Sequence, residues 1–564
     1  MSWKLKKKYD DLLASEEGHQ KKIWGELLKI CLAYPNYYRT GMSNLGFQTI
    51  YSLINREPSF LCERVFLPDP EDEAAFSSGS MPLFSLESQK PLTEFDIIAF
   101  SIPFENDYPA ILKMLGMGRI ALLAGERKET EPLILGGGVS VTLNPEPLAD
   151  FFDLFLLGEA EEALPEFLRT FEDACRSGLG RNDLLSRTQK NIEGAYVPKY
   201  YRVYYRADHL IEEIKPVDAA LPLKIKTRQI SDLNAFTTEQ SISTPSGEFK
   251  EIFLTEVSRG CRRGCRFCAA GFLYRPARFR RLSTLEPSFI RGMEKQKKIG
   301  LLGTAVSDHP DISSLCRYII GKEGGVSLGS LRLDRLDHEI ASLLEKSHVE
   351  TVSLAPEAGS QRLRDAIRKG ITDEDIFRAV ELLTLHNILN IRLYFMVGLP
   401  TETEEDIDAI IALVQRIKHH VAKTSAGKKR FKRITLSVNQ FIPKPATPFQ
   451  WLPLEDINAV RKKMRKIVNA LRKEPSVKVT HDLPKWNYIQ ALLSLGDRRL
   501  SAILLAAHAN EGNWPRAFKE VNVNPDFYVY RRKGTDEVLP WDFIDHGIDK
   551  SHLVREYERA IMQH

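Results

Sequence analysis

Residues 257–268, VSRGCRRGCRFC, decide which fold and chemistry this sequence predicts. The segment holds three of the seven cysteines of the chain and directly follows residues 251–257, an apolar run typical of a β-strand. A loop at the carboxyl end of that strand is therefore expected. Three thiolates at this spacing hold one face of a metal centre and leave a position on the metal open. The three cysteines are Cys261, Cys265 and Cys268.

Spacing alone leaves two kinds of metal site open. One is a 4Fe–4S cluster, which normally takes four cysteines and here would keep one iron free for a substrate. The other is a zinc site that a distant residue, His309 or Cys316, would complete.

The composition is that of an ordinary globular protein with several domains. The chain has 564 residues, of which 43% are hydrophobic and 27% charged. A net charge of +4 is too near neutral to indicate nucleic acid or a membrane as partner. No secretory signal and no apolar run of about 18 residues is visible. The sparse, odd set of cysteines is typical of metal binding in a reducing compartment, so we expect a cytoplasmic protein without a membrane span.

Two successive α/β patterns predict the architecture. The first has strand candidates at residues 30–34, 96–100, 132–135 and 153–157, which predict a Rossmann-like, doubly wound parallel sheet with its ligand site at the strand carboxyl ends. The second has six strand candidates, too few for a closed eight-fold barrel. These six lie at 251–257, 301–306, 325–333, 350–355, 391–397 and 434–441.

The expected fold class is therefore α/β: a Rossmann-like sheet, then a partial (β/α)6 barrel, then a mainly helical segment. The predicted parts are the N-terminal domain at 1–190, a connector at 191–247, the partial barrel at 248–453 and the C-terminal segment at 454–564.

The cysteine loop, with Phe267 before the third cysteine, resembles the signature of the radical S-adenosylmethionine (SAM) superfamily. Three later segments resemble the strand-end motifs of that family, in the right order over about 200 residues: VSLAPEAGS at 352–360, RLYFMVGLPTE at 392–402 and NQFIPKPATPF at 439–449. The resemblance implies a 4Fe–4S cluster on the three cysteines. It also implies reductive cleavage of SAM to a 5′-deoxyadenosyl radical, and it outweighs the zinc alternative.

The same resemblance implies which residues contact SAM. Glu357 stands in the fourth-strand motif whose acidic residue touches the cofactor. Gly303 and Asp308 stand where the family has a Gly-Gly-Glu strand end, although that motif is not present literally. Arg332 follows the third strand candidate, where it pairs either with the SAM carboxylate or with Asp334. The expected SAM-contacting residues are Phe267, Gly303, Asp308, Arg332, Glu357 and Arg392.

The N-terminal pattern resembles the radical SAM subclass with a cobalamin-binding-type domain. The resemblance lies in IIAFSIPF at 97–104, LGGGVSVTLNPEP at 135–147 and FLLGEAE at 155–161. Glycines there would let the backbone approach a corrin or its nucleotide tail, and helix N-termini would accept the tail phosphate. The alternative is a vestigial domain that binds nothing. The expected cobalamin-contacting residues are Ser101, Gly137, Gly138, Thr142, Gly158 and Glu159.

A lower cobalt ligand from the N-terminal domain is not expected. The Asp-x-His-x-x-Gly motif is absent, and no histidine occurs between His19 and His209.

Charged segments leave alternatives. The eight arginines between 259 and 281 either offset the cluster thiolates, or dock a reductant such as flavodoxin or ferredoxin or an anionic substrate, or form a solvated face. The basic run at 418–433 favours an exposed connector over nucleic-acid binding. We expect Trp541 and His546 to be core residues rather than part of a substrate lid.

The leading functional hypothesis is a cobalamin-dependent radical methyltransferase that acts on an unactivated carbon. The alternative is a radical RNA- or protein-modifying enzyme, similar to methylthiotransferases, whose N-terminal domain binds no cobalamin. Such enzymes carry a second cluster, and Cys31, Cys62 and Cys175 are too dispersed to indicate one. A non-catalytic cluster protein is disfavoured by the intact strand-end motifs. The substrate is not fixed by these motifs, because pocket shape sets specificity.

Overall fold

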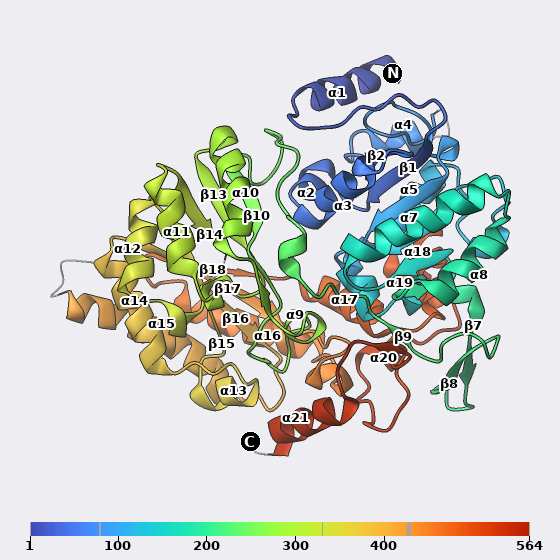
Figure 1. The fold of residues 1–564 in the computed structure, drawn as a ribbon. Helices are drawn as coiled ribbons and strands as arrows, with labels where there is room; N and C mark the ends of the chain where they lie inside the picture. Colours follow the sequence, from blue (N-terminus) through green and yellow to red (C-terminus); the bar gives the residue numbers. More distant parts are fainter. Residues whose placement is uncertain (1, 78–80, 330, 426–429, 563–564) are drawn as a thin grey trace.

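The computed structural model describes residues 2–77, 81–329, 331–425 and 430–562. Two α/β lobes lie side by side, the N-terminal lobe in blue to cyan and the barrel lobe in green to orange (Figure 1). The last part of the chain returns to the N-terminal lobe, where its helices join the same hydrophobic core. None of the described helices is long and apolar enough to cross a membrane.

The N-terminal lobe is a doubly wound sheet, as predicted. Its strand order is β2-β1-β3-β4-β5-β6, and every pairing is parallel except that of β6 with β5. This order places a topological switch point between β1 and β3, where open α/β sheets bind ligands. The strands are β1 (Leu28–Tyr34), β2 (Phe60–Phe66), β3 (Ile97–Ser101), β4 (Leu133–Gly137), β5 (Leu154–Leu156) and β6 (Ala195–Tyr196).

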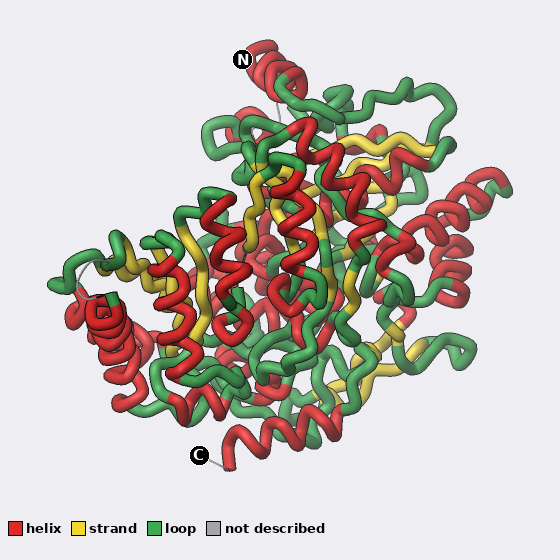
Figure 2. The backbone as a smooth tube through the Cα atoms, turned by 60° about the vertical axis from the view of Figure 1, so that its left-hand side comes forward, coloured by secondary structure: helices red, strands yellow, loops and turns green. Residues whose placement is uncertain are grey.

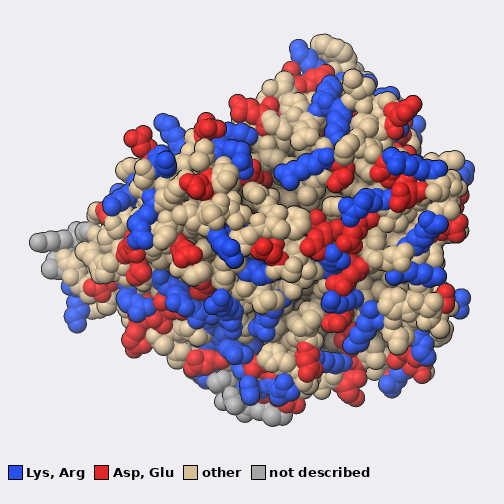
Figure 3. All heavy atoms as spheres, in the orientation of Figure 1, with Lys and Arg blue, Asp and Glu red and all other residues tan. Residues whose placement is uncertain are grey.

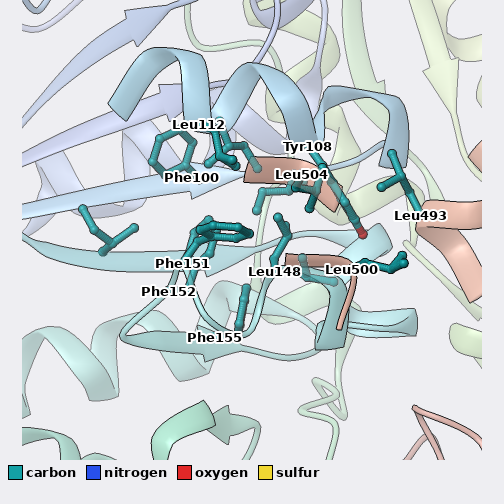
Figure 4. Close-up of a cluster of buried hydrophobic side chains, with 14 of the residues drawn as sticks. Phe100, Tyr108, Leu112, Leu148, Phe151, Phe152, Phe155, Leu493, Leu500 and Leu504 are labelled. Carbon is teal, nitrogen blue, oxygen red and sulfur yellow. The ribbon is translucent and has the colours of Figure 1, made fainter. Parts of the chain in front are cut away.

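Helices cover both faces of this sheet. On one face, α3 (Leu45–Arg56) and α7 (Ala160–Arg176) share a core with β1 and β4. On the other face, α5 (Tyr108–Met117) and the C-terminal α18 (Leu500–Ala509) pack against the rings of Phe100 and Phe155 (Figure 4). The segment predicted to be mainly helical therefore completes the core of the N-terminal lobe.

Strand β2 was not predicted, and its sequence explains why. FLCERVF carries Glu63 and Arg64 in its middle, yet every residue is buried. The Arg64 guanidinium donates to the carboxylates of Glu16 and Glu87, both at 2.7 Å. A buried charge destabilises the fold unless such partners are present, and here they come from residues far away in sequence.

The barrel lobe is an open parallel sheet in two pieces. β10-β13-β14 form one piece and β15-β16-β17-β18 the other, and a single bridge between Leu331 and Leu354 joins them. The strands are β10 (Ile252–Glu256), β13 (Lys298–Leu302), β14 (Gly325–Leu328), β15 (Thr351–Glu357), β16 (Asn390–Val397), β17 (Arg433–Gln440) and β18 (Val477–His481).

Three details of the barrel differ from the prediction. The second strand begins and ends earlier than 301–306, because the apolar stretch from Ile299 pairs with β10. The third strand ends at Leu328 instead of 333. β18 adds a seventh strand beyond the expected barrel end at 453, and its alternating exposed residues resemble an edge strand.

Helices surround the barrel strands on the outside (Figure 2). The basic helix α16 (Ile457–Leu471) packs on the barrel through Met464, Ile467 and Leu471, as predicted. Trp541 is also a core residue as expected: it is 2% exposed and donates its ring N–H to Gln450 Oε1 at 2.6 Å. The other barrel helices are α10 (Leu282–Lys295), α11 (Ile312–Gly321), α12 (His338–Lys346), α13 (Gln361–Ala366), α14 (Asp373–Leu385) and α15 (Glu404–Thr424).

Candidate functional site: the cysteine loop and the cavity between the lobes

The three cysteines lie in a loop after β10, at the carboxyl end of the strand, as expected. Cys265 is buried, Cys261 and Cys268 are partly exposed, and all three are free thiols. Gly264, between the first two cysteines, has φ = +81°, a conformation that favours glycine. Within the part of the chain that the structure describes, the three sulfurs do not all lie within 4.8 Å of one another.

Lys369 and Glu357 form a partly buried ion pair beside the loop. The Lys369 Nζ lies 3.0 Å from Glu357 Oε1 and 6.0 Å from the centroid of the Phe267 ring. Glu357 ends β15 at a register shift, with φ = +67°. A non-glycine residue in this region is strained, and such strain clusters at functional sites. Lys369 was not predicted, because it belongs to the turn after α13 and to no motif.

Burial and nearby positive groups shift the pKa values of the thiols in opposite directions. Burial raises the pKa of Cys265, and Lys369 and Arg332 lower it. Burial also raises the pKa of Cys268 to about 11, with a lowering contribution from the Gly271 N–H. Burial therefore disfavours the thiolate form of Cys265 and Cys268, and a positively charged metal centre would favour it.

Arg332 satisfies one of its two predicted roles and leaves room for the other. Its Nε donates to Asp334 Oδ1 at 3.0 Å, while its Nη2 is buried without a hydrogen-bond partner in the described structure. Asp308 is held by Arg263 at 3.2 Å and lies 3.5 Å from Arg335. Asp308 is thus already paired, and the orphaned Nη2 is the donor that a ligand carboxylate would satisfy.

The remaining predicted SAM residues are spread over the barrel. Phe267 packs, partly buried, against the cluster of Ala358 and Leu363. Gly303 follows β13, where an added Cβ would lie 2.2 Å from Ser258 Oγ, so chain packing requires a glycine. Arg392 is exposed near the start of β16, away from the carboxyl end that carries the loop, and makes no ion pair with a described residue.

A cavity of about 390 Å³ lies between the two lobes. Its size is typical of a small-molecule site, and it touches the strand carboxyl ends of both lobes. From the N-terminal lobe, five of the six predicted residues line it: Ser101, Gly137, Gly138, Gly158 and Glu159. From the barrel lobe, Ser258, Arg259, Tyr274, Leu302, Gly303 and Thr304 line it.

The inner part of the cavity is an apolar slot. Leu32, Ala99 and Leu135 lie opposite one another in register on the sheet face, and Ile50 of α3 and Leu164 of α7 face them. A more polar chamber of about 450 Å³ adjoins the slot. No histidine lines either space among the residues described.

Contacts within the chain explain two of the predicted glycines. A Cβ on Gly138 (φ = +123°) would lie 2.5 Å from the Ile102 carbonyl, and one on Gly158 (φ = +110°) 2.1 Å from the Arg228 carbonyl. Close approach of a ligand is therefore not needed to account for either. Gly137 differs: it lines the cavity, and the nearest atom to its Cβ position is a carbonyl at 3.5 Å.

Thr142 does not line the cavity. Its hydroxyl donates to the Gly138 carbonyl at 2.8 Å and accepts the Gly158 N–H at 3.1 Å. The His546 ring lies 2.9 Å from the Thr142 carbonyl, and burial lowers the pKa of His546. Thr142 and His546 thus hold the segments after β4 and β5 in place without facing the cavity.

Three arginines of the arginine-rich segment are paired with carboxylates rather than solvated, whereas Arg262 and Arg281 are exposed. Arg259 bridges Glu161 of the N-terminal lobe at 2.6 Å and Glu256 of the barrel at 2.8 Å. Arg278 donates to Glu159 at 2.5 Å, and the side chain of Arg280 is fully buried on Glu256. The pairs Arg259–Glu161 and Arg278–Glu159 join the two lobes beside the cavity, whereas Arg280 and Glu256 both belong to the barrel lobe.

Family comparisons agree with this geometry. Residues 255–414 match the model of the radical SAM superfamily, and residues 46–198 match the model of the N-terminal region of radical SAM proteins. The chain is therefore a radical SAM enzyme, with a 4Fe–4S cluster and SAM as the cofactors of its family.

Individual relatives are more distant. The chain is 28% identical over 478 residues to an uncharacterised protein of Methanocaldococcus jannaschii, which covers 84% of this chain and 90% of that protein. It is 28% identical over 294 residues to the anaerobic magnesium-protoporphyrin IX monomethyl ester cyclase of Rubrivivax gelatinosus, about half of each chain (50% and 49%).

Two solved structures have a similar arrangement. The radical SAM methyltransferase TsrM of Kitasatospora setae, with cobalamin and a 4Fe–4S cluster bound, is 12% identical with a TM-score of 0.48, over 73% of this chain and 75% of that one. The cobalamin-dependent radical enzyme OxsB, with aqua-cobalamin and SAM bound, is 13% identical with a TM-score of 0.47, over 95% and 79%. Likeness at this level assigns no ligand to the present chain.

Proposed function

We propose that this radical SAM enzyme transfers a methyl group from cobalamin to an unactivated carbon atom. The observation that carries the proposal is the cavity between the lobes, which is lined by Ser258 and Arg259, just before the cysteines, on one side and by the ends of a doubly wound sheet on the other. A cofactor in the N-terminal lobe and a radical formed at the barrel would thereby meet the same substrate.

The barrel residues fit a cluster and SAM. Cys261, Cys265 and Cys268 would hold the cluster, which when reduced supplies the electron that cleaves SAM. The orphaned Nη2 of Arg332 would bind the SAM carboxylate, since a buried guanidinium N–H without a partner is costly. Lys369 donates to Glu357 Oε1 and would hold that carboxylate in place to contact the amino or ribose groups of the ligand.

The N-terminal lobe fits cobalamin by shape. The slot between the sheet and helices α3 and α7 has small residues, Ala99 and Gly137, on its floor, where a flat aromatic base of a nucleotide tail would pack. Helix α7 begins at the cavity edge with Ala160, so its free N–H groups lie near a tail phosphate. Cobalamin, when bound, supplies the methyl group, which it receives from a second SAM. Cavity residues provide no histidine for the metal.

The walls of the cavity also protect the reaction. Leucine and isoleucine side chains line the slot, and the arginine–glutamate pairs close the seam between the lobes. Water is a poor competitor in such an apolar space, and a substrate radical is held close to its partner.

Anaerobic reconstitution tests the proposal in one preparation. With iron, sulfide, cobalamin, SAM and a chemical reductant, the protein should form 5′-deoxyadenosine and retain cobalamin through gel filtration. SAM labelled in its methyl group should then place the label on a metabolite, protein or RNA nucleoside in extracts. SAM cleavage without cobalamin retention would contradict methyl transfer from cobalamin and favour the methylthiotransferase-like alternative.

A further inference from the structure

Five arginine side chains gather on the surface around the cysteine loop. In Figure 3, Lys and Arg side chains cluster over the region where Figure 1 places α9 (Ala270–Leu273), α13 and the C-terminal helix α21 (Lys550–Met562). We call this surface the cationic face. Its members are Arg262, Arg275, Arg368, Arg555 and Arg559.

Carboxylates leave most of this charge unbalanced. Glu556 accepts from Arg559 at 2.8 Å and from Arg368 at 3.0 Å, and its side chain is only 3% exposed. Arg262, Arg275 and Arg555 form no ion pair within the described residues. Their polar contacts are with neutral groups or rings, such as the Gly271 carbonyl for Arg275 at 2.8 Å.

The cationic face lies directly on the loop that holds the cysteines. A Cβ on Gly264 would lie 2.6 Å from Arg275 Nη2 and 3.9 Å from Arg368 Nη1. Helix α21 extends the face with Arg555 and Arg559. Burial lowers the pKa of His552 on this helix, Glu556 raises it, and the nearby guanidinium groups of Arg275, Arg555 and Arg368 lower it, which places these three cations close together. Like charges held this close repel each other, and binding of an anionic partner would reduce that repulsion.

We infer that the cationic face is the docking surface of a small acidic electron-carrier protein. The inference rests on the proposed function and names the partner that the same site needs. In the docked state, the reduced flavin or iron–sulfur centre of the carrier loses one electron and the cluster gains it. That electron then enters the C–S bond of SAM, which breaks to methionine and the 5′-deoxyadenosyl radical.

The side chains of this face favour a protein over a nucleic acid. Proteins that bind single-stranded nucleic acid present exposed aromatic rings on which bases stack. Here the guanidinium of Arg262 lies 5.0 Å from the Phe279 ring centroid and that of Arg275 lies 4.4 Å from the ring of Phe272, so the rings are covered. Transient electron-transfer complexes instead use small charged surfaces that speed encounter.

Charge reversal on α21 tests the inference, since that helix holds none of the cysteines. The variants are Arg555→Glu and the double variant R555E/R559E, with the conservative Arg555→Lys. The matched control is Arg187→Glu, an exposed arginine on α8 (Arg181–Asn191) in the N-terminal lobe. The probe is a purified acidic flavodoxin, and the readouts are its Kd for the reconstituted enzyme and the rate of SAM cleavage that it supports.

We expect the double variant to bind flavodoxin about tenfold more weakly at low salt and to lose most of the salt dependence of binding between about 50 and 200 mM. Arg555→Lys and Arg187→Glu should behave as wild type. Cleavage driven by dithionite should be equal in all variants, which shows that the cluster is intact.

Two results would overturn the inference: an unchanged Kd in the double variant, or an equal loss in Arg187→Glu. Loss of affinity for total RNA, with flavodoxin binding unchanged, would also overturn it and assign the face to nucleic acid. Failure of wild-type protein to cleave SAM with dithionite would contradict the proposed function instead, and the binding measurement would still decide the docking surface.

Discussion

The two lobes present their candidate ligand-binding groups in different ways. On the barrel side, charged and sulfur-bearing groups stand ready for ligands: three free thiols, the Lys369–Glu357 pair and an orphaned N–H of Arg332. On the N-terminal side, the polar groups are already used, Glu159 by Arg278 and the Thr142 hydroxyl by backbone atoms. Ligand binding on the barrel side is thus expected to depend on particular chemical groups, and on the N-terminal side on the shape of the cavity. Removing a chemical group should therefore impair the barrel side, and filling the cavity should impair the N-terminal side.

The largest effect is expected for Cys265→Ala. Loss of one of three thiolates should prevent assembly of the cluster, so SAM cleavage should fall by at least about 1,000-fold. Iron and sulfide content, the visible spectrum and 5′-deoxyadenosine formation measure this. The matched control is Cys175→Ala, an exposed cysteine on α7, which should keep full activity. A Cys265→Ala protein that still cleaved SAM would remove the basis for the cluster assignment.

On the N-terminal side, Gly137→Leu should fill the slot. The side chain enters open space, so the lobe should fold, while affinity for cobalamin should fall about tenfold or more. SAM cleavage in the absence of substrate should stay near the wild-type rate. Gly125→Leu is the control, since nothing lies within 4 Å of its Cβ position and it is outside the cavity. Equal cobalamin retention in both variants would argue against cobalamin in this slot.

Lys369→Met should weaken SAM binding about 10- to 100-fold. The substitution leaves the partly buried Glu357 carboxylate without its charged partner, and a charge-assisted hydrogen bond contributes about 1.5–3 kcal/mol. Equilibrium dialysis with SAM on the reconstituted protein measures the Kd. Lys346→Met, an exposed lysine at the end of α12, is the control. If both variants bind SAM like wild type, Lys369 acts in folding rather than in ligand binding.

The smallest effect concerns stability and pH. Burial raises the pKa of Asp107, the residue before α5, to about 6, although Asn36 donates to its carboxylate at 2.8 Å. Because the folded-state pKa is raised, this group contributes stability below about pH 4 that is lost as pH rises through 6, on the order of 2 kcal/mol.

Asp107→Asn removes the titration. The midpoint of thermal unfolding should therefore change less between about pH 5 and 7 in the variant than in wild type. Calorimetry of both proteins in matched buffers measures it. Parallel curves for the two proteins would show that Asp107 does not titrate in this range.

The same contrast explains what could be predicted from sequence. The positions of the cysteine loop and Glu357 at the ends of strands were predicted correctly, because local spacing and short strand patterns encode them. Lys369 was missed because only the turn after α13 brings it to the thiols. Strand β2 was missed because the partners of its buried Arg64 lie elsewhere in the chain. Hydrophobic periodicity along the sequence indicates local secondary structure and does not reveal pairings between distant residues.

The N-terminal glycines show a different limit. The sequence marked Gly137, Gly138 and Gly158 alike, and all three line the cavity, yet chain packing accounts for the small size of Gly138 and Gly158 and not for that of Gly137. A glycine motif indicates that something approaches closely and does not say whether that is a ligand or the chain itself.

Glu556 has a consequence for how the protein is made. Its carboxylate accepts from Arg266 Nε, in the cysteine loop, at 3.1 Å across 290 residues of sequence. A growing chain that has left the ribosome only as far as the barrel has its cysteines but lacks this brace. Cluster delivery is therefore expected to follow synthesis of α21, and a truncation before residue 550 should yield soluble protein that fails to mature with iron.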